Sequence, residues 1–285
     1  MQDPIAPITI ALIGVTVYLS WRGFKNGAFF DKYSFRIDSI LGRKEYYRVV
    51  SSGFLHADLP HLIFNAICFY SFGEGVELIF GKATLLSIYF LSLVSGGLLS
   101  LLIHRNHQDY TAVGASGAVS GIIFASIFLL PGGSVTLFLI PIPIPSAIFA
   151  ILYTVISIYG IRTQKGNIGH GAHLGGAITG MLVTAALYPQ AVKASPLLFA
   201  FIMVLTVGFL AFTFKTQLFG FRIGTSVSKH SFTCPGSIDH KQRAQMRSEL
   251  DRLLQKVNEV GLGGLSRQEK KRLHFISKKL REDEK

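Results

Sequence analysis

Apolar residues are grouped along the first 214 positions into runs of roughly 16 to 20, separated by shorter polar, glycine- or proline-containing segments. An α-helix rises about 1.5 Å per residue, so each run is about long enough to cross a hydrocarbon layer ~30 Å thick. The first run lacks a preceding basic cluster and a cleavage site after it, so we expect a retained helix rather than a secretory signal. The pattern predicts seven membrane-spanning helices, at residues 5–20, 61–80, 84–103, 113–130, 146–161, 172–188 and 197–214.

Two connecting segments differ from these runs. Residues 21–54 mix aromatic with charged side chains, which predicts a segment lying at the membrane interface. The stretch "FLIPIPIPS" carries Pro141, Pro143 and Pro145, which remove N–H donors and restrict φ. We therefore expect a non-helical connector between the fourth and fifth predicted helices.

After Phe214 the hydropathy falls and a polar tail begins. Ser266 and Glu269 are three residues apart, which predicts a capping box at the start of a helix. An earlier helix is predicted to end at Gly261, because apolar residues recur before it at helical spacing. These residues are Met246, Leu250, Leu253 and Val257. The tail is thus predicted to form a helical hairpin.

Composition sharpens this division. A hydrophobic share of 49% and a mean hydropathy of +0.43 exclude an ordinary soluble domain. Of the 28 Lys and Arg residues 16 follow Phe214, against 8 of the 16 Asp and Glu, so the tail carries +8 of the net charge of +12. We predict an all-α polytopic membrane protein, with a six-helix membrane core at 1–192, an additional transmembrane helix at 193–214 and a basic soluble tail at 215–285.

Polar residues of types used in catalysis occur in three of the apolar runs, where their burial is costly. In "HADLPHLIFNAICF", His61 and Asn65 are four residues apart and share one helical face, while His56 precedes the helix. An imidazole and an amide on one face can both donate hydrogen bonds to a single oxygen. Alternatively, such a pair holds neighbouring helices together.

The second place is "GASGAVSG", at residues 114–121. Ser116 lies at the start of a predicted helix, where unpaired N–H groups and the helix dipole favour a developing oxyanion. Gly114 and Gly117 leave its hydroxyl accessible, although glycines here also suit close helix packing.

The third place is "GHGAHLGGAITG", in which His173 begins the sixth predicted helix and His170 lies three residues earlier. A lone histidine here would more often be a packing residue. The second, fourth and sixth predicted helices cross the membrane in the same direction. Alternation therefore predicts that His61, Ser116 and His173 lie at one end of the bundle.

Together these motifs resemble the rhomboid family of intramembrane serine proteases. The resemblance covers roughly residues 45–188, through "YYR", "FLHADLPHLIFN", "FGEGVELIFG", "GASG" and "AHLGGAITG". It implies a six-helix core and a dyad without a carboxylate, in which Ser116 is the nucleophile and His173 the general base. It further implies that His61 and Asn65 stabilise the oxyanion, that no cofactor or metal is required, and that the substrates are transmembrane proteins.

Supporting positions match the family as well. His56 matches a family histidine that precedes the second helix. Arg48 matches the arginine of a family Trp-Arg pair, in which Tyr47 replaces the Trp. Glu77 matches an acidic position with a structural role. One departure is Ser120, where some members have an aromatic residue stacked on the catalytic imidazole. The orientation of the imidazole must then be fixed in another way.

Two other functions are open. A catalytically silent relative would keep the fold and only bind membrane helices. A metal protein would use the four histidines expected near one face, although the chain has no HExxH motif and no carboxylate placed to complete a zinc site. These histidines are His56, His61, His170 and His173.

The expected partners are transmembrane protein substrates and the lipid bilayer. The basic tail favours a solvated hairpin or contact with anionic lipid, and no recognition motif predicts a nucleic-acid partner. The simple architecture favours a bacterial cytoplasmic membrane. The family resemblance implies an extracytoplasmic site, whereas the distribution of Lys and Arg among the loops favours the opposite orientation.

Overall fold

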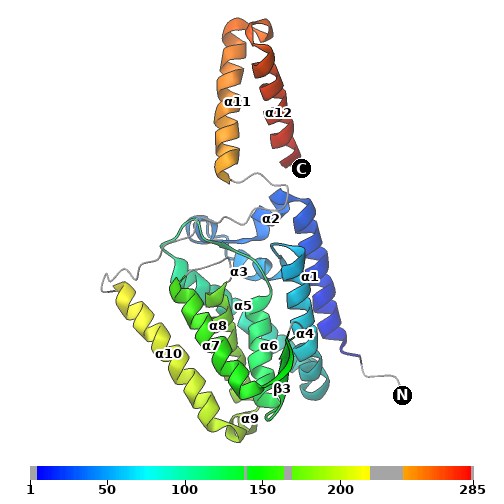
Figure 1. The fold of residues 1–285 in the computed structure, drawn as a ribbon, viewed down its shortest axis with the longest axis vertical. Coiled ribbons are helices and arrows are strands. Elements are labelled where there is room, and N and C mark those ends of the chain that lie inside the picture. The colour runs from blue at the N-terminus through cyan, green and yellow to red at the C-terminus, as the bar shows by residue number, and fades with distance from the viewer. Residues whose placement is uncertain (1–4, 138–139, 164–168, 219–239, 284–285) are drawn as a thin grey trace.

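The computed structural model describes residues 5–137, 140–163, 169–218 and 240–283 (Figure 1). Every predicted spanning run is helical in it. The corresponding helices are α1 (Pro7–Lys25), α4 (Leu59–Phe80), α5 (Lys82–His104), α6 (Ser116–Leu129), α7 (Ser146–Thr163), α8 (His170–Leu187) and α10 (Pro196–Leu218). The all-α polytopic fold is thereby confirmed.

Membrane-spanning length separates these helices into two groups. Among the described residues, five helices are long and apolar enough to cross a membrane, namely α1, α4, α5, α7 and α10. Helix α6 is apolar but shorter, with 14 residues. Helix α8 has 18 residues, and its first turn carries His170 and His173.

Helix α6 lies in the middle of the bundle, with α4, α5 and α8 against it and α1 and α10 further out (Figure 1). Its sequence is apolar on all sides, and every residue from 117 to 129 is buried. A helix without a polar face has to be surrounded by other helices or by lipid. The two neighbours α5 and α8 also pack on one another.

Close approach of α6 and α8 depends on glycine. A Cβ at Gly176 would overlap the carbonyl oxygen of Gly117, and one at Gly180 would overlap that of Gly121. Backbone therefore packs directly on backbone along this interface, as small residues allow in membrane bundles. This close packing places the first turn of α8 beside the first turn of α6.

The outer helix α1 is held at its N-terminus by Glu77, near the end of α4. The Glu77 carboxylate accepts hydrogen bonds from the backbone N–H of Ile8 (2.9 Å) and Thr9 (2.7 Å), and from the Thr9 hydroxyl (2.8 Å). The first N–H groups of a helix have no intrahelical acceptor, and a negative charge there also suits the helix dipole. Glu77 thus fixes α1 against α4 at the end of α4 away from His61.

The connecting segments contain short elements. Residues 21–54 include α2 (Gly27–Tyr33), β1 (Phe35–Arg36), η1 (Asp38–Gly42), α3 (Arg48–Ser51) and η2 (Ser52–Phe54). Strand β1 pairs with β2 (Thr111–Ala112), just before α6. The proline-rich connector forms β4 (Ile140–Pro145), antiparallel to β3 (Ser134–Leu137), and alternate prolines suit a two-stranded ribbon that leaves N–H positions unpaired.

The polar tail forms a helical hairpin, as its apolar spacing predicts. Helix α11 (His240–Val260) is followed by Gly261, with φ of 71°, by η3 (Leu262–Gly264) and by α12 (Arg267–Asp283). The capping box is present: the Ser266 N–H donates to the Glu269 carboxylate (2.9 Å) and the Glu269 N–H to the Ser266 hydroxyl (3.2 Å). A short helix, α9 (Pro189–Ala194), was not expected from the sequence.

Candidate functional site

Ser116 and His173 lie next to each other at one end of the bundle. Ser116 is the first residue of α6 and His173 is in the first turn of α8, and the distance from His173 Nε2 to Ser116 Oγ is 2.8 Å. The glycine contacts between α6 and α8 set this separation. A Cβ at Gly117 would lie only 3.2 Å from the carbonyl oxygen of Ala172. One hydroxyl and one imidazole nitrogen are therefore within hydrogen-bonding distance, as proton transfer requires.

Backbone geometry fixes the loop that leads into Ser116. Gly114 has φ of 130°, a conformation that other residues rarely adopt, and a Cβ there would lie 2.9 Å from the His61 ring. Its N–H donates to the Ser52 carbonyl (3.0 Å), which fixes the loop before α6. Because Ser116 begins α6, its own N–H has no acceptor within the helix.

His61 and Asn65 share one face of α4 beside this loop. Asp58 caps α4 by accepting the His61 N–H (2.8 Å), and Pro60 occupies the first turn, where its missing N–H has no cost. Asn65 is buried, and one of its amide N–H groups donates to the His61 carbonyl (3.0 Å). The His61 imidazole faces Gly114, one position from Ala115 at the start of α6.

His56 is completely buried and holds the start of α6. The single hydroxyl hydrogen of Ser20 donates to the Phe54 carbonyl (3.1 Å), so Ser20 Oγ accepts from His56 Nδ1 at 3.0 Å. This leaves His56 Nε2 as the acceptor of the Ala115 N–H at 3.4 Å. His56 therefore connects α1 to the residue that precedes Ser116.

Tyr153, on α7, is a site residue that the sequence did not indicate. Its ring centroid lies 6.0 Å from that of His173, with the two planes inclined by 35°. The Ser120 hydroxyl donates to the Ser116 carbonyl (2.6 Å), so it accepts a short hydrogen bond from the Tyr153 hydroxyl. The small side chain at position 120 is what lets a tyrosine from another helix reach this place, and only the tertiary fold reveals it.

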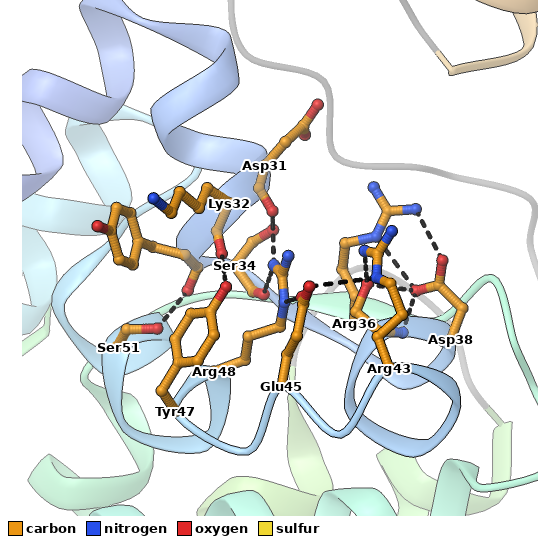
Figure 2. Close-up of polar contacts among 12 residues, drawn as sticks. Asp31, Lys32, Ser34, Arg36, Asp38, Arg43, Glu45, Tyr47, Arg48 and Ser51 are labelled. Carbon is orange, nitrogen blue, oxygen red and sulfur yellow. Dashed lines mark hydrogen bonds and ion pairs between the residues drawn. The ribbon is translucent and has the colours of Figure 1, made fainter.

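Arg48 belongs to a separate network in the α1–α4 connection (Figure 2). Its guanidinium is buried and donates to the carbonyls of Asp31 (2.6 Å) and Ser34 (2.8 Å) and to the Glu45 carboxylate (2.6 Å). The hydrogen bond from Arg48 lowers the pKa of Glu45. Tyr47 donates its hydroxyl to the Lys32 carbonyl (3.1 Å). These contacts fold the connection, and none of them involves Ser116 or His173. Glu77 bonds the start of α1 instead.

The four histidines make two close ring contacts. Ring centroids are 4.9 Å apart for His56 and His61, and 5.8 Å apart for His170 and His173. Within the described parts of the chain, no group of three or more His, Cys, Asp or Glu side chains is arranged to hold a metal ion. Nor does any described carboxylate form a hydrogen bond with His173.

Comparisons with known proteins agree with this architecture. A family model described as "Rhomboid domain" matches residues 43–190, which is 148 of the 285 residues, and a model for a family of unknown function, DUF6576, matches residues 237–279. The chain is 28% identical to "RHOMBOID-like protein 12, mitochondrial" of Arabidopsis thaliana, covering 65% of this chain and 58% of the relative. It is 28% identical to "Rhomboid protein 1, mitochondrial" of Saccharomyces cerevisiae, covering 61% and 51%.

A bacterial relative is similar at the same level. "Rhomboid protease GluP" of Bacillus subtilis is 30% identical over 176 residues, which are 61% of this chain and 33% of the relative. The chain thus spans between a third and three fifths of the length of these relatives. The matches cover the helices that carry Ser116 and His173.

Proposed function

Because this chain belongs to the rhomboid family and is an integral multi-pass membrane protein, we propose that it is an intramembrane serine protease. The observation that carries the proposal is the 2.8 Å separation between Ser116 Oγ and His173 Nε2. A neutral imidazole at this distance can accept the hydroxyl proton while the serine oxygen attacks a peptide carbonyl. The substrates would be transmembrane proteins, cut in or near their membrane segments.

The reaction would proceed in two halves. In the first, His173 takes the Ser116 proton, Oγ bonds to the carbonyl carbon, and the collapse of the tetrahedral intermediate passes that proton to the leaving amine. In the second, His173 takes a proton from water as the water oxygen bonds to the acyl carbon; the bond from that carbon to Oγ then breaks, the proton passes from His173 to Ser116 Oγ, and the carboxylic acid product leaves. Water must therefore reach a site formed by polar residues at the end of the bundle, where the first turns of α4, α6 and α8 meet.

Negative charge on the intermediate would be stabilised by donors around Ser116. The N–H of Ser116 points out of the first turn of α6, and the His61 imidazole and the second N–H of the Asn65 amide lie on the facing turn of α4. Each such donor is worth on the order of 3 kcal/mol in the transition state of a serine protease. His56 would act indirectly, by holding Ala115 and so the direction of the Ser116 N–H.

Tyr153 would fix the direction of the His173 ring. The dyad has no carboxylate to orient its imidazole, and the tyrosine supplies a packed ring anchored by Ser120 instead. We assign Tyr153 a positioning role, because its hydroxyl bonds Ser120 and not the reacting atoms.

The test is loss of cleavage of a co-expressed membrane substrate in Ser116→Ala and in His173→Ala. We expect each change to lower the rate on the order of 10⁴-fold or more, because the two groups act as one unit. Ser126→Ala is the matched control, since Ser126 is a buried serine of the same helix whose hydroxyl bonds only the Ile123 carbonyl. If cleavage persists in either variant, Ser116 and His173 are not the catalytic dyad.

The competing function is a silent relative that binds membrane helices without cutting them. A fluorophosphonate probe reacts with an activated serine whatever the natural substrate is. If the probe labels the wild type but not Ser116→Ala, the protease is supported. If it does not label a folded wild type, the silent relative is supported.

The location in the cell is a separate question. The similar proteins reported above include mitochondrial and bacterial ones, so the bacterial cytoplasmic membrane stays a prediction.

A further inference from the structure

The hairpin leaves one face of α12 without a packing partner. Its apolar side chains meet across the α11–α12 seam, where Leu253 and Ile276 are buried. Two acidic groups are paired beside the seam: Arg272 pairs with Glu249 (3.0 Å), and Lys256 with Glu269 (2.7 Å). These ion pairs neutralise charge at the seam and leave the outward face of α12 as the charged surface.

The outward face of α12 carries Arg, Lys and His side chains, and no acidic one among its described side chains. Arg267, Lys270, Lys271 and His274 are exposed, and at 100° per residue they fall within an arc of about 100°. No ion pair or side-chain hydrogen bond within the described chain involves any of them. The register of the helix adds Lys278 and Arg281 to the same arc. We call this surface the basic face of α12.

The outward face of α11 is different. Its exposed residues are of mixed charge, because Arg247 and Arg252 lie beside Asp251 and Glu259. Positive and negative groups thus alternate on the exposed surface of α11, whereas the outward arc of α12 has no acidic member among its described side chains. An anionic partner would therefore be attracted more strongly to α12.

An aromatic side chain borders the basic face. Phe275 is 50% exposed, and the Arg272 guanidinium lies 5.7 Å from its ring centroid. A basic helical face flanked by an exposed aromatic ring is typical of segments that lie on the lipid interface. Nucleic-acid surfaces more often interleave several aromatic residues with basic ones, and α12 has one.

Covalent attachment keeps α12 close to lipid. The spanning helix α10 ends at Leu218 and α11 begins at His240, so 21 residues (219–239) connect them. Whatever their conformation, they reach at most about 75 Å. Because the tail is tethered to a membrane-spanning helix, the effective concentration of lipid surface near the basic face is high.

We infer that the basic face of α12, with Phe275 at its edge, binds the anionic headgroup surface of the membrane in which the bundle lies. Lys and Arg clustered on one face of an amphipathic helix are attracted by anionic lipid, and the attraction falls off within a Debye length of the surface. The inference is independent of the proposed protease activity, because none of its residues belongs to the Ser116–His173 site.

The test places the full chain, with Trp21→Phe and Phe275→Trp, in vesicles that contain lipids with brominated acyl chains. Trp21 is the single tryptophan, so the fluorescence of this variant reports the edge of α12 alone. We expect quenching of about twofold in vesicles with about 30 mol% phosphatidylglycerol, little in pure phosphatidylcholine, and reversal by salt at about 0.5 M.

Two further variants, equal to each other in net charge, distinguish the effect of the basic face of α12 from the effect of the net charge of the tail. Arg267→Gln, Lys270→Gln and Lys271→Gln together remove three positive charges from α12, and we expect them to abolish quenching. Ser248→Glu, Gln255→Glu and Asn258→Glu together add three negative charges to α11, and we expect them to preserve most of it. Circular dichroism of the tail checks that both variants keep their helices.

Three results would overturn the inference. Equal quenching in the two kinds of vesicle would mean that anionic lipid is not recognised. Equal loss in the two triple variants would mean that net charge acts rather than α12. No quenching by phosphatidylglycerol vesicles, with an emission change on adding a short single-stranded oligonucleotide, would assign the surface to nucleic acid.

Discussion

The membrane bundle and the C-terminal hairpin are both helical, but different forces hold their helices together. In the bundle, glycine lets α6 and α8 meet backbone to backbone, because lipid provides no hydrophobic force between helices. In the hairpin, an apolar seam of Leu253 and Ile276 is removed from water and is flanked by ion pairs. The α6–α8 interface depends on close packing, and the α11–α12 interface depends on the burial of apolar surface. Substitutions of similar size should therefore have different effects in the two regions.

The largest effect is expected from one added methyl group in the bundle. Gly176→Ala would place a Cβ against the Gly117 carbonyl oxygen, and backbone cannot move aside as a side chain can. We expect a loss of more than about 3 kcal/mol of stability in detergent, measured by thermal unfolding. Gly208→Ala on α10 is the control, since a Cβ there meets nothing within 4 Å. If both variants unfold alike, close packing does not distinguish the bundle.

The second effect is expected from removing apolar volume in the hairpin. Ile276 is fully buried, so Ile276→Ala should lower the stability of the hairpin by about 2–4 kcal/mol. Hydrogen exchange of α11 and α12 should rise while that of α6 stays unchanged. Leu254→Ala, at a side chain that is 45% exposed, should have little effect. Unfolding of the bundle by Ile276→Ala would show that the two regions are one cooperative unit.

A smaller effect is expected from the polar contacts that serve the site. Tyr153→Phe keeps the ring beside His173 and removes the hydroxyl bond to Ser120. A lost hydrogen bond of about 1 kcal/mol corresponds to a roughly fivefold slower reaction with a fluorophosphonate, at nearly unchanged stability. Tyr159→Phe, on the lipid-facing side of the same helix, should react at the wild-type rate. An unchanged rate in Tyr153→Phe would reject the positioning role.

The smallest effect is expected from pH, at a carboxylate of the hairpin. The hydrogen bond from Lys256, and further bonds from Ser266, lower the pKa of Glu269 from 4.5 to about 2. A carboxyl whose pKa is lower in the folded state adds stability above its unfolded pKa and loses it as the pH falls. The opening free energy of α12, taken from hydrogen-exchange rates divided by the intrinsic exchange rate at each pH, should therefore fall as the pH drops from about 4.5 towards 2. Glu269→Gln should flatten that dependence, and an equally steep dependence in the variant would contradict it.

Sequence pattern indicated most of the secondary structure, for identifiable reasons. The apolar runs and the Ser266–Glu269 pair depend on interactions between near neighbours, so they could be found without coordinates. The short elements at residues 27–54 could not, because Arg48 folds that segment by bonding carbonyls 14 and 17 residues away. The β3–β4 hairpin was likewise expected only as a non-helical connector.

The amino-acid sequence by itself determined that this is a polytopic helical membrane protein of the rhomboid family with a basic helical tail, since periodicity, hydropathy and local motifs carry that information. It also indicated Ser116 and His173, because helix alternation brings like ends together. Only the tertiary structure decided how the pair is held: His56 against Ala115, and Tyr153 with Ser120 beside His173. The physical reason is that these contacts join three different helices, α6, α7 and α8, and the loops before α4 and α6, and no spacing along the chain encodes a distance across the bundle.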